Sequence, residues 1–318
     1  MAARHTKFVG LFPTARAIPE ALQIGRTDTI DTVEAMVLGG QSVLLLEERR
    51  IGKSSVALAV IERVRTSEGD ALALDVDLRY GARTSSAAAR ELLSQARAQG
   101  ADRRVALLHH RGRLSKLGEA ARNRIADAGQ LFGEPDEAKA AERIASVLAG
   151  TGDVALDHAL RAVDAHARVH GQRVVIFIDE VQDLASWPDT DDVQRAIAGI
   201  EAQTGCRTSF VFAGSEATAI DALFRHGAEL DFIGHRVPLG RIELADWQRG
   251  LPPRFTEAGL VIDPAQIAQI YLATDGHPLR TMSVCAQCLL VVPGDEVTNA
   301  TVTQAIASAR SHPSWREA

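Results

Sequence analysis

The sequence predicts an α/β fold, in which helices flank a mostly parallel sheet, followed by a small helical domain. Short apolar runs with strand character alternate with longer segments whose apolar residues recur at helical spacing, which is the pattern of a parallel sheet with helical crossovers. The strand-like runs stop near Asp246, and the helical segments after it are separated by glycine and proline turns. We therefore expect an α/β domain over residues 1–245, with a helical insertion at about 82–168, and a helical domain over residues 246–318.

Each expected element follows from a local pattern. The expected strands are short apolar runs next to turn residues: Val43–Leu46, Ala71–Val76, Val174–Ile178, Ser209–Ala213 and a fifth between Val237 and Leu244. The expected helices of the second domain are separated by Gly259, Gly276 and the Pro293-Gly294 turn: Trp247–Ala258, Pro264–Ala273, Pro278–Leu290 and Thr301–Ala309.

The composition is that of a folded globular protein. Hydrophobic residues make up 46% and charged residues 24%, which excludes a disordered chain. The net charge of -6 gives no chain-wide attraction to nucleic acid or anionic lipid. No apolar run approaches the ~18–20 residues needed to span a bilayer, and the apolar stretch Phe8–Phe12 is too short for a signal peptide. Three cysteines are too few for a disulfide framework. These features predict a cytoplasmic protein that does not act in a membrane.

The segment from Glu47 to Ser54 has the pattern of a phosphate-binding P-loop, because it follows a buried strand, ends in Gly-Lys-Ser and opens a helix. Gly52 lets the backbone approach phosphates closely, and the amide groups that open the helix are oriented donors. Lys53 places a positive charge on the terminal phosphates, and the Ser54 hydroxyl is a magnesium ligand. Glu47 departs from the pattern, since it puts a carboxylate where the pattern has its first glycine.

A second motif supports the first. The segment Val174–Glu180 is a continuous apolar strand that ends in two carboxylates. A buried strand of this kind places Asp179 where it can hold magnesium, and it places Glu180 where it can act as general base on the attacking water. The two motifs occur in this order and each follows a strand, which predicts that the chain binds ATP with Mg²⁺.

Together the two motifs resemble those of the archaeal-type ATPases, which belong to the STAND group of AAA+-related P-loop proteins, near the origin-recognition branch. The resemblance rests on Arg49–Ser55 and Ile178–Leu184, and it extends more weakly over Ile24–Leu290. It implies a three-layer P-loop core with the sheet order 5-1-4-3-2, followed by a C-terminal helical lid.

The resemblance implies nucleotide contacts from three segments. Ile24, Gly25 and Arg26 resemble the family's segment that lies against adenine, with a helix-entry turn capped by Thr27 as the open alternative. Pro278 lies in a Gly-His-Pro turn similar to that of the family's lid. The P-loop contacts would come from Arg50, Ile51, Gly52, Lys53, Ser54 and Ser55.

The resemblance also implies three residues that act on hydrolysis beside Glu180. Ser215 follows the fourth strand, where the family has a sensor that orients water or reads the γ-phosphate. Arg280 resembles a sensor arginine in the lid, with an exposed helix-start arginine as the alternative. Arg236 resembles an arginine finger that reaches a neighbouring subunit's nucleotide. One residue inserted after Gly234 leaves a surface arginine as the alternative.

The predicted function is an ATPase that binds ATP with Mg²⁺ and hydrolyses it slowly, to switch the conformation or assembly of a partner complex. The resemblance implies a separate protein partner or effector, and a homo-oligomer is compatible with it. Two alternatives stay open. One is a nucleotide-binding regulator with little hydrolysis, which Glu47 favours. The other is an ATP-dependent DNA-binding accessory protein, which rests on the stretch Arg83–Arg124, where ten Arg or Lys stand against three Asp or Glu.

Overall fold

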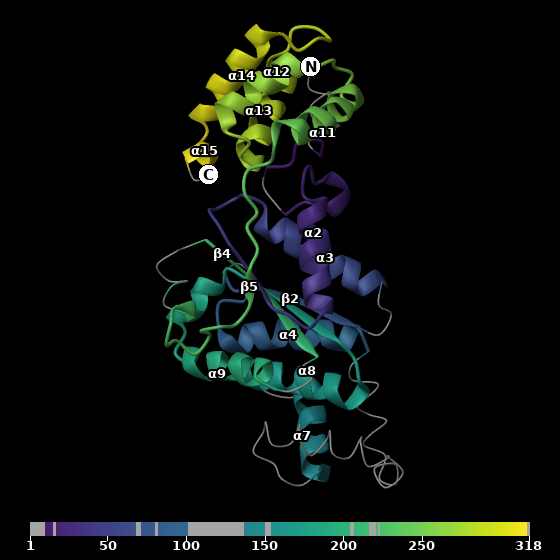
Figure 1. Cartoon of the computed structure of the whole chain (residues 1–318), viewed down its shortest axis with the longest axis vertical. Coiled ribbons are helices and arrows are strands. Elements are labelled where there is room, and N and C mark those ends of the chain that lie inside the picture. The colour runs from purple at the N-terminus through teal and green to yellow at the C-terminus, as the bar shows by residue number, and fades with distance from the viewer. Residues whose placement is uncertain are drawn as a thin grey trace. The chain divides into compact units, whose positions relative to one another are not determined.

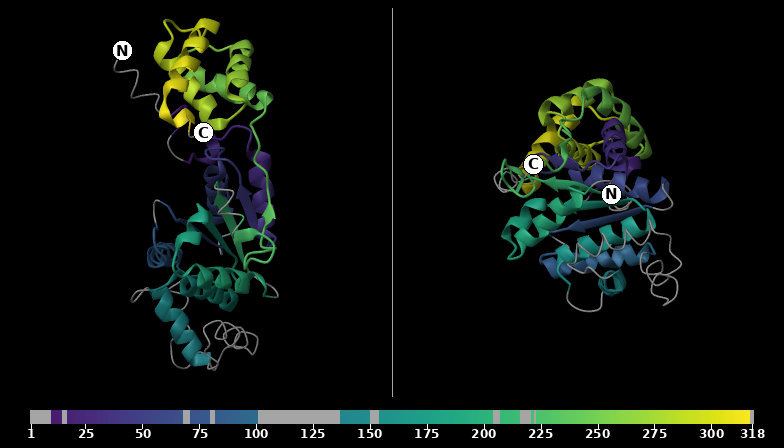
Figure 2. Two further views of the ribbon diagram at one scale, coloured as in Figure 1. Left: turned by 90° about the vertical axis from the view of Figure 1, so that its left-hand side faces the viewer. Right: turned by 60° about the horizontal axis from the view of Figure 1, so that its bottom comes forward.

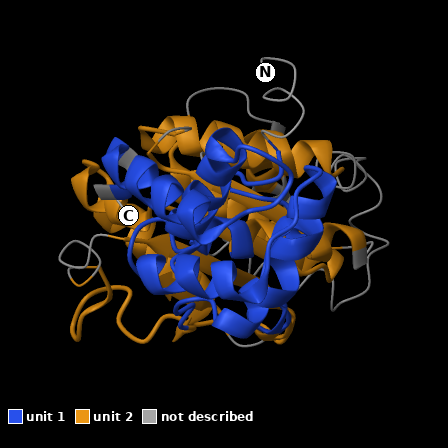
Figure 3. Ribbon diagram, turned by 90° about the horizontal axis from the view of Figure 1, so that it is seen from above, with its two compact units in different colours: residues 1–31, 47–56, 238–318 blue, residues 32–46, 57–237 orange. Residues whose placement is uncertain are grey.

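The chain divides into two compact units, drawn in two colours in Figure 3. The sheet unit, orange in Figure 3, comprises residues 32–46 and 57–237. The lid unit, blue in Figure 3, comprises residues 1–31, 47–56 and 238–318, and it holds the P-loop segment and the C-terminal helices. The expected domain boundary near residue 245 stays a prediction.

The structure is a computed structural model of the 318-residue chain. It describes residues 10–14, 17–67, 71–79, 82–100, 137–149, 154–203, 207–215, 221 and 223–316. Most of the basic stretch predicted at 83–124, from residue 101 onward, lies outside the described residues.

The sheet has five parallel strands in the order β2-β3-β4-β1-β5 (Figure 1). The strands are β1 (Val43–Leu46), β2 (Leu72–Asp77), β3 (Val174–Asp179), β4 (Thr208–Gly214) and β5 (His235–Arg236). This is the predicted order read from the opposite edge, so the predicted fold class is confirmed. The central strands β3 and β4 are buried along nearly their whole length, which explains their unbroken apolar sequences.

The fifth strand differs from its prediction. It is the two-residue β5, His235–Arg236, instead of a strand between Val237 and Leu244. Gly234 has a φ of 80° and brings the chain against β1, so the N–H of His235 donates to the carbonyl of Ser42 at 2.8 Å. Pro238 has no N–H, so it cannot extend the ladder. A strand of two residues is too short to be recognised in the sequence as an apolar run.

Helices cover both faces of the sheet within its unit (Figure 1; Figure 2). One layer contains α4 (Ser85–Ala98), α7 (Glu137–Ala149), α8 (Leu156–His170) and α9 (Thr190–Glu201), and the other contains α2 (Thr27–Leu38) and α3 (Lys53–Ser67). Leu74, Ile176 and Phe210 face the first layer and share its apolar core. Ser209, which alternates with Phe210, faces the second layer, and its Oγ donates to the carbonyl of Val37 in α2 at 3.0 Å. The sheet unit is therefore a three-layer α/β/α structure.

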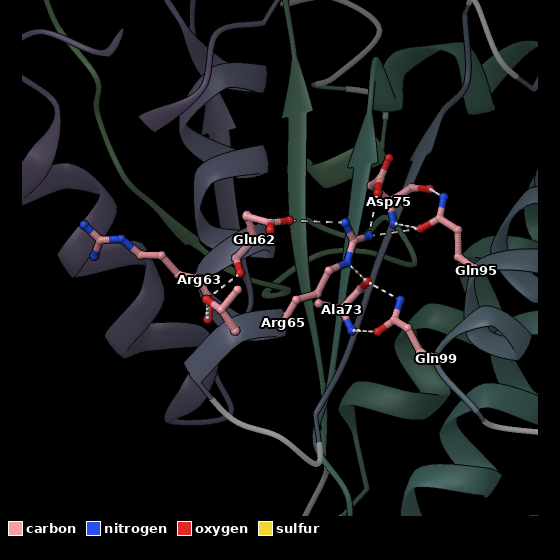
Figure 4. A network of polar contacts seen from close by, with 8 residues as sticks. Glu62, Arg63, Arg65, Ala73, Asp75, Gln95 and Gln99 are labelled. Carbon is pink, nitrogen blue, oxygen red and sulfur yellow. Dashed lines mark hydrogen bonds and ion pairs between the residues drawn. The ribbon is translucent and has the colours of Figure 1, made fainter. Parts of the chain in front are cut away.

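The outer edge of β2 is closed by two glutamine side chains of α4 (Figure 4). Gln95 accepts from the N–H of Asp75 at 2.9 Å and donates to its carbonyl at 2.6 Å. Gln99, one helical turn later, does the same for Ala73, at 3.0 and 2.8 Å. Arg65 of α3 adds a bond to the Ala73 carbonyl and an ion pair with Asp75, each at 3.0 Å. The amides replace the partners that a neighbouring strand would supply, so the edge cannot pair with another chain.

We expect the double substitution Gln95→Ala/Gln99→Ala to lower the free energy of unfolding by about 1–3 kcal/mol, because the N–H groups of Ala73 and Asp75 and the carbonyl of Asp75 lose their amide partners, while the carbonyl of Ala73 keeps only Arg65. Urea denaturation measures the loss, and light scattering measures the association of the exposed edges. Ser94→Ala, at an exposed position of the same helix, is the matched control. A double variant as stable and monodisperse as the control would contradict this role.

The lid unit is built on the predicted C-terminal helices, which are confirmed and which we call the lid. They are α11 (Leu244–Glu257), α12 (Pro264–Thr274), α13 (Pro278–Val291), α14 (Asn299–Ser311) and the short α15 (Pro313–Arg316). The N-terminal segment joins their apolar core, where the ring of Phe12 packs 4.9 Å from that of Phe255. The buried guanidinium of Arg254 donates to the carbonyls of Leu11, at 3.0 Å, and Leu22. None of the helices in the described residues is long and apolar enough to cross a membrane.

Candidate functional site

The P-loop segment leaves the end of β1 and turns into α3 at Lys53. Gly52 has a φ of 107°, which L side chains rarely adopt, so glycine is required there for conformational reasons. The carbonyl of Gly52 already accepts the first helical bond, from the N–H of Val56 at 3.0 Å. The loop therefore delivers the chain directly into a helix N-terminus, where backbone N–H groups can bind an anion.

Lys53 lies across the loop. Its side chain is only 8% exposed, and Nζ donates to the carbonyls of Glu47 at 2.9 Å and Glu48 at 2.6 Å. An ammonium group has three donors and no acceptor, so phosphate oxygens can replace these carbonyls as its partners. The arrangement fits a nucleotide, because a charged donor and a helix N-terminus occupy adjacent positions of one loop.

The N-terminal segment is fastened to the start of α3. The N–H of Ile18 donates to Ser55 Oγ at 3.1 Å, and Gln23 Nε2 donates to the Ser55 carbonyl at 2.8 Å. Ser55 is thus engaged by the chain's own N-terminal segment. Ser54, the predicted magnesium ligand, is half-buried in the first turn of the same helix.

Arg26 has a role that the sequence did not indicate. Its buried guanidinium donates to the carbonyls of Ile51 at 3.0 Å, Gly240 at 2.9 Å and Leu239, so it ties the P-loop to the segment that enters the lid. Burial lowers its pKa to about 10, and the nearby carboxylate of Glu47 opposes that shift.

Ile24 and Gly25 pack against α11. A Cβ on Gly250 would lie 2.7 Å from the Ile24 side chain, so only glycine at 250 admits Ile24. Gly25 has a φ of 64°, and a Cβ there would lie 2.7 Å from a carboxylate oxygen of Asp246. Both residues are positioned by the lid. Their predicted contact with adenine stays a prediction.

The carboxyl ends of the central strands meet at one edge of the sheet. β1 and β4 pair with Leu46 opposite Gly214, and β3 and β4 pair with Ile178 opposite Phe212. Asp179 ends β3, and Ser215 directly follows β4. The Ser215 hydroxyl is buried and has no hydrogen-bond partner among the described residues. A buried, unsatisfied hydroxyl at this edge is what a ligand-reading residue requires.

Glu180 is restrained by Arg79, which sequence reasoning missed. Glu180 has a φ of 54°, its N–H donates to Asp179 Oδ1 at 2.9 Å, and its carboxylate accepts from Gln182 Nε2. The Arg79 guanidinium lies 3.5 Å from Glu180 Oε1 and 3.3 Å from Asp183 Oδ1. The available signal was the position of Arg79, two residues beyond the end of β2, which pairs with β3.

The predicted Gly-His-Pro turn opens α13 and belongs, with the P-loop, to the lid unit. Gly276 has a φ of 62°, and a Cβ there would lie 2.4 Å from the carbonyl oxygen of Ile242. His277 is fully buried and caps α13, since its ring Nδ1 accepts the N–H of Arg280 at 3.5 Å. Burial and the guanidiniums of Arg241 and Arg280 lower the pKa of His277 to about 4, and the backbone of Arg49 opposes that shift. At neutral pH the ring is uncharged, as an acceptor at a cap must be. Pro278 takes the first helical position, for which its fixed φ is suited.

Arg241 links the P-loop to the lid. Its guanidinium lies 2.8 Å from Glu48 in the loop and 3.6 Å from Asp275 beside the Gly-His-Pro turn. Both acidic residues are well exposed, so each pair contributes little to stability. The bridge nevertheless gives the loop and the turn a shared partner.

The two predicted hydrolytic arginines lie in different environments. Arg236 is exposed on β5, paired with Leu44 of β1, and the neighbouring Phe232 is 88% exposed with a φ of 68°. The Arg280 guanidinium lies 5.6 Å from the centroid of the Trp315 ring. Their predicted roles in hydrolysis stay predictions.

Solved structures are similar to this chain, whereas no family model and no curated protein matches it. A Walker-type ATPase of Pyrococcus abyssi has a TM-score of 0.62 at 17% identity, over 94% of this chain and 75% of that one. The chain has the fold of an archaeal Walker-type ATPase. The ORC2 protein of Aeropyrum pernix, in ADPNP–ADP complexes, has a TM-score of 0.59 at 16% identity, over 93% and 71%. The Aeropyrum pernix ORC1 protein in complex with DNA has a TM-score of 0.51 at 15% identity, over 94% and 68%.

The Walker-type fold confirms the predicted resemblance at the level of architecture, with origin-recognition proteins among the similar structures. Cys285 and Cys288 are buried thiols of the lid core, and burial raises the pKa of both. In the part of the chain that the structure describes, no three His, Cys, Asp or Glu side chains are grouped as metal ligands. These two cysteines form a Cys-x-x-Cys pattern in this Walker-type ATPase fold, and both are part of the apolar core of the lid.

Proposed function

We propose that the chain binds ATP with Mg²⁺ and hydrolyses it slowly, to switch its own conformation or the assembly of a partner complex. The observation that carries the proposal is Lys53, whose ammonium spans the P-loop at the point where β1 passes into α3. The Walker-type fold supports it, because β1, β3 and β4 end at the same edge of the sheet.

In this function, the residues of the chain have separate tasks. Gly52 and the helix N-terminus would bind phosphate, Lys53 would neutralise its charge, and Ser54 and Asp179 would hold the magnesium ion. When bound, the ion would neutralise charge that develops on the phosphates. Glu180 would take the proton of the water that attacks the γ-phosphorus.

The contacts of Glu180 favour slow hydrolysis. The Arg79 guanidinium lies 3.5 Å from Glu180 Oε1, and Gln182 donates to Oε2, so each oxygen of the carboxylate already has a partner. These contacts fix the orientation of the carboxylate, which restricts the directions from which it can accept a proton from water. The same observation supports the second candidate function, a nucleotide-binding regulator with little hydrolysis.

Ser215, Arg280 and Arg236 complete the proposal. The unsatisfied hydroxyl of Ser215 suits a residue that reads the γ-phosphate or the attacking water. Arg280 would contact phosphate from the lid. Arg236, exposed at the sheet edge, would act on the nucleotide of a second copy, so the active form would be a homo-oligomer.

The partner is proposed to be a separate protein. One similar solved structure is a complex with DNA, and DNA is therefore included as a test condition rather than as a proposed ligand. The deciding experiment measures ATP binding and turnover by the purified chain and its Lys53→Ala and Glu180→Gln variants, with and without double-stranded DNA at two salt concentrations. ATP binding that survives Lys53→Ala would refute the proposed function.

The Glu47 carboxylate should make a small difference to affinity. We expect Glu47→Gln to tighten ATP binding by less than about tenfold, about 1 kcal/mol, because it removes one negative charge from the phosphate-binding loop. Titration calorimetry at low and high salt measures the change. Glu48→Gln, which removes the exposed neighbour paired with Arg241, is the control. Weaker ATP binding by Glu47→Gln would mean that the carboxylate contacts the bound ligand favourably.

A further inference from the structure

Trp315 of α15 (Pro313–Arg316) lies close to two arginine side chains. The guanidinium of Arg280 in α13 is 5.6 Å from the centre of its ring, and that of Arg310 in α14 is 5.8 Å away. The indole also packs against the apolar core of the lid, so the ring itself is anchored. A cation within about 6 Å of an indole face is attracted to it.

Arg280 has this ring in place of an acidic partner. Within the described residues its side chain forms no ion pair, and its Nε is buried without a hydrogen-bond partner. By contrast, Arg241 on the neighbouring segment pairs with two carboxylates. The π-face of an aromatic ring attracts a nearby guanidinium, whereas a carboxylate would occupy the N–H donors of the guanidinium.

Arg280 lies at the end of α13 that is near the P-loop. It is in the first turn of that helix, and Asp275, just before the helix, shares Arg241 with Glu48 of the P-loop, at 3.6 and 2.8 Å. All of these residues belong to one compact unit.

We propose that Trp315 is a positioning residue for the nucleotide site: its ring holds the Arg280 guanidinium so that the N–H donors of the guanidinium remain available to the terminal phosphate of ATP. This inference rests on the proposed function, and it assigns the C-terminal helix α15 to the phosphate-reading part of the lid.

The test compares ATP with ADP, because only ATP carries the phosphate that Arg280 would read. Trp315→Leu keeps an apolar side chain against the lid core and removes the aromatic face. We expect it to weaken ATP binding about threefold to tenfold and to leave ADP binding unchanged, as measured by calorimetry with Mg²⁺. Trp315→Phe should restore most of the affinity for ATP. Arg310→Ala, which removes the other cation near the ring, should bind both nucleotides as the wild type does.

Fluorescence provides a readout independent of turnover. We expect ATP, but not ADP, to change the tryptophan emission of the wild type as Arg280 moves on the ring. The change should be absent from Trp315→Phe, in which Trp187 and Trp247 still fluoresce. It should also be absent from Arg280→Ala, which keeps all three tryptophans.

Two results would overturn the inference. Equal loss of ATP and ADP affinity in Trp315→Leu would mean that Trp315 only stabilises the lid. Tighter binding of ATP by that variant would mean that the ring keeps Arg280 away from the terminal phosphate. Either result leaves the proposed function intact as long as Lys53→Ala abolishes binding. If Lys53→Ala binds ATP normally, the proposed function fails whatever Trp315 does.

Discussion

Lys53→Ala should lose ATP binding, with a cost of about 2–4 kcal/mol, or roughly 30-fold to 1000-fold in affinity. The ammonium is the charged donor of the P-loop, and two of its present partners are carbonyls of the same loop, which water can bind after the substitution. The global fold should survive, because neither of the two apolar cores includes Lys53. Calorimetry with ATP–Mg²⁺ measures the affinity, and thermal unfolding checks the fold.

Lys139→Ala is the matched control for that experiment, since it removes the same charge from an exposed position of α7. It should bind ATP as the wild type does. Unchanged affinity in Lys53→Ala, with the fold intact, would exclude a nucleotide at the P-loop.

Glu180→Gln should bind ATP normally and hydrolyse it at least about 10²-fold more slowly than the wild type. The amide keeps the shape of the side chain but cannot accept the proton of the attacking water. It also removes the ion pair with Arg79, so a small change in stability should accompany the loss of turnover. Single-turnover hydrolysis of ATP measures the rate.

Asp183→Asn separates the two effects, because Asp183 shares Arg79 with Glu180 but is not the proposed base. It should keep at least the turnover of the wild type. Equal loss of turnover in both variants would mean that the Arg79 cluster has only a structural role. A wild type with no turnover above background would favour the regulator with little hydrolysis.

Much of the architecture was determined by the sequence alone. Apolar runs such as that of β3 and the helical spacing after Gly52 are local patterns, and each reports the environment of its own segment. The P-loop and the Asp179-Glu180 pair are also local, because their chemistry needs fixed residue types at fixed spacing after a strand. The short β5 was misplaced, since two residues carry no period and its position depends on β1.

The contacts that give the candidate site its character were decided only by tertiary structure. Arg79 beside Glu180, Arg26 under the P-loop and Trp315 beside Arg280 each join residues far apart in the chain. The sequence alone does not show whether the guanidinium of an arginine contacts water, backbone carbonyls or an aromatic ring. Its partner is chosen by the packing of whole helices and strands, because burial makes an unsatisfied charge costly and so selects which groups must meet.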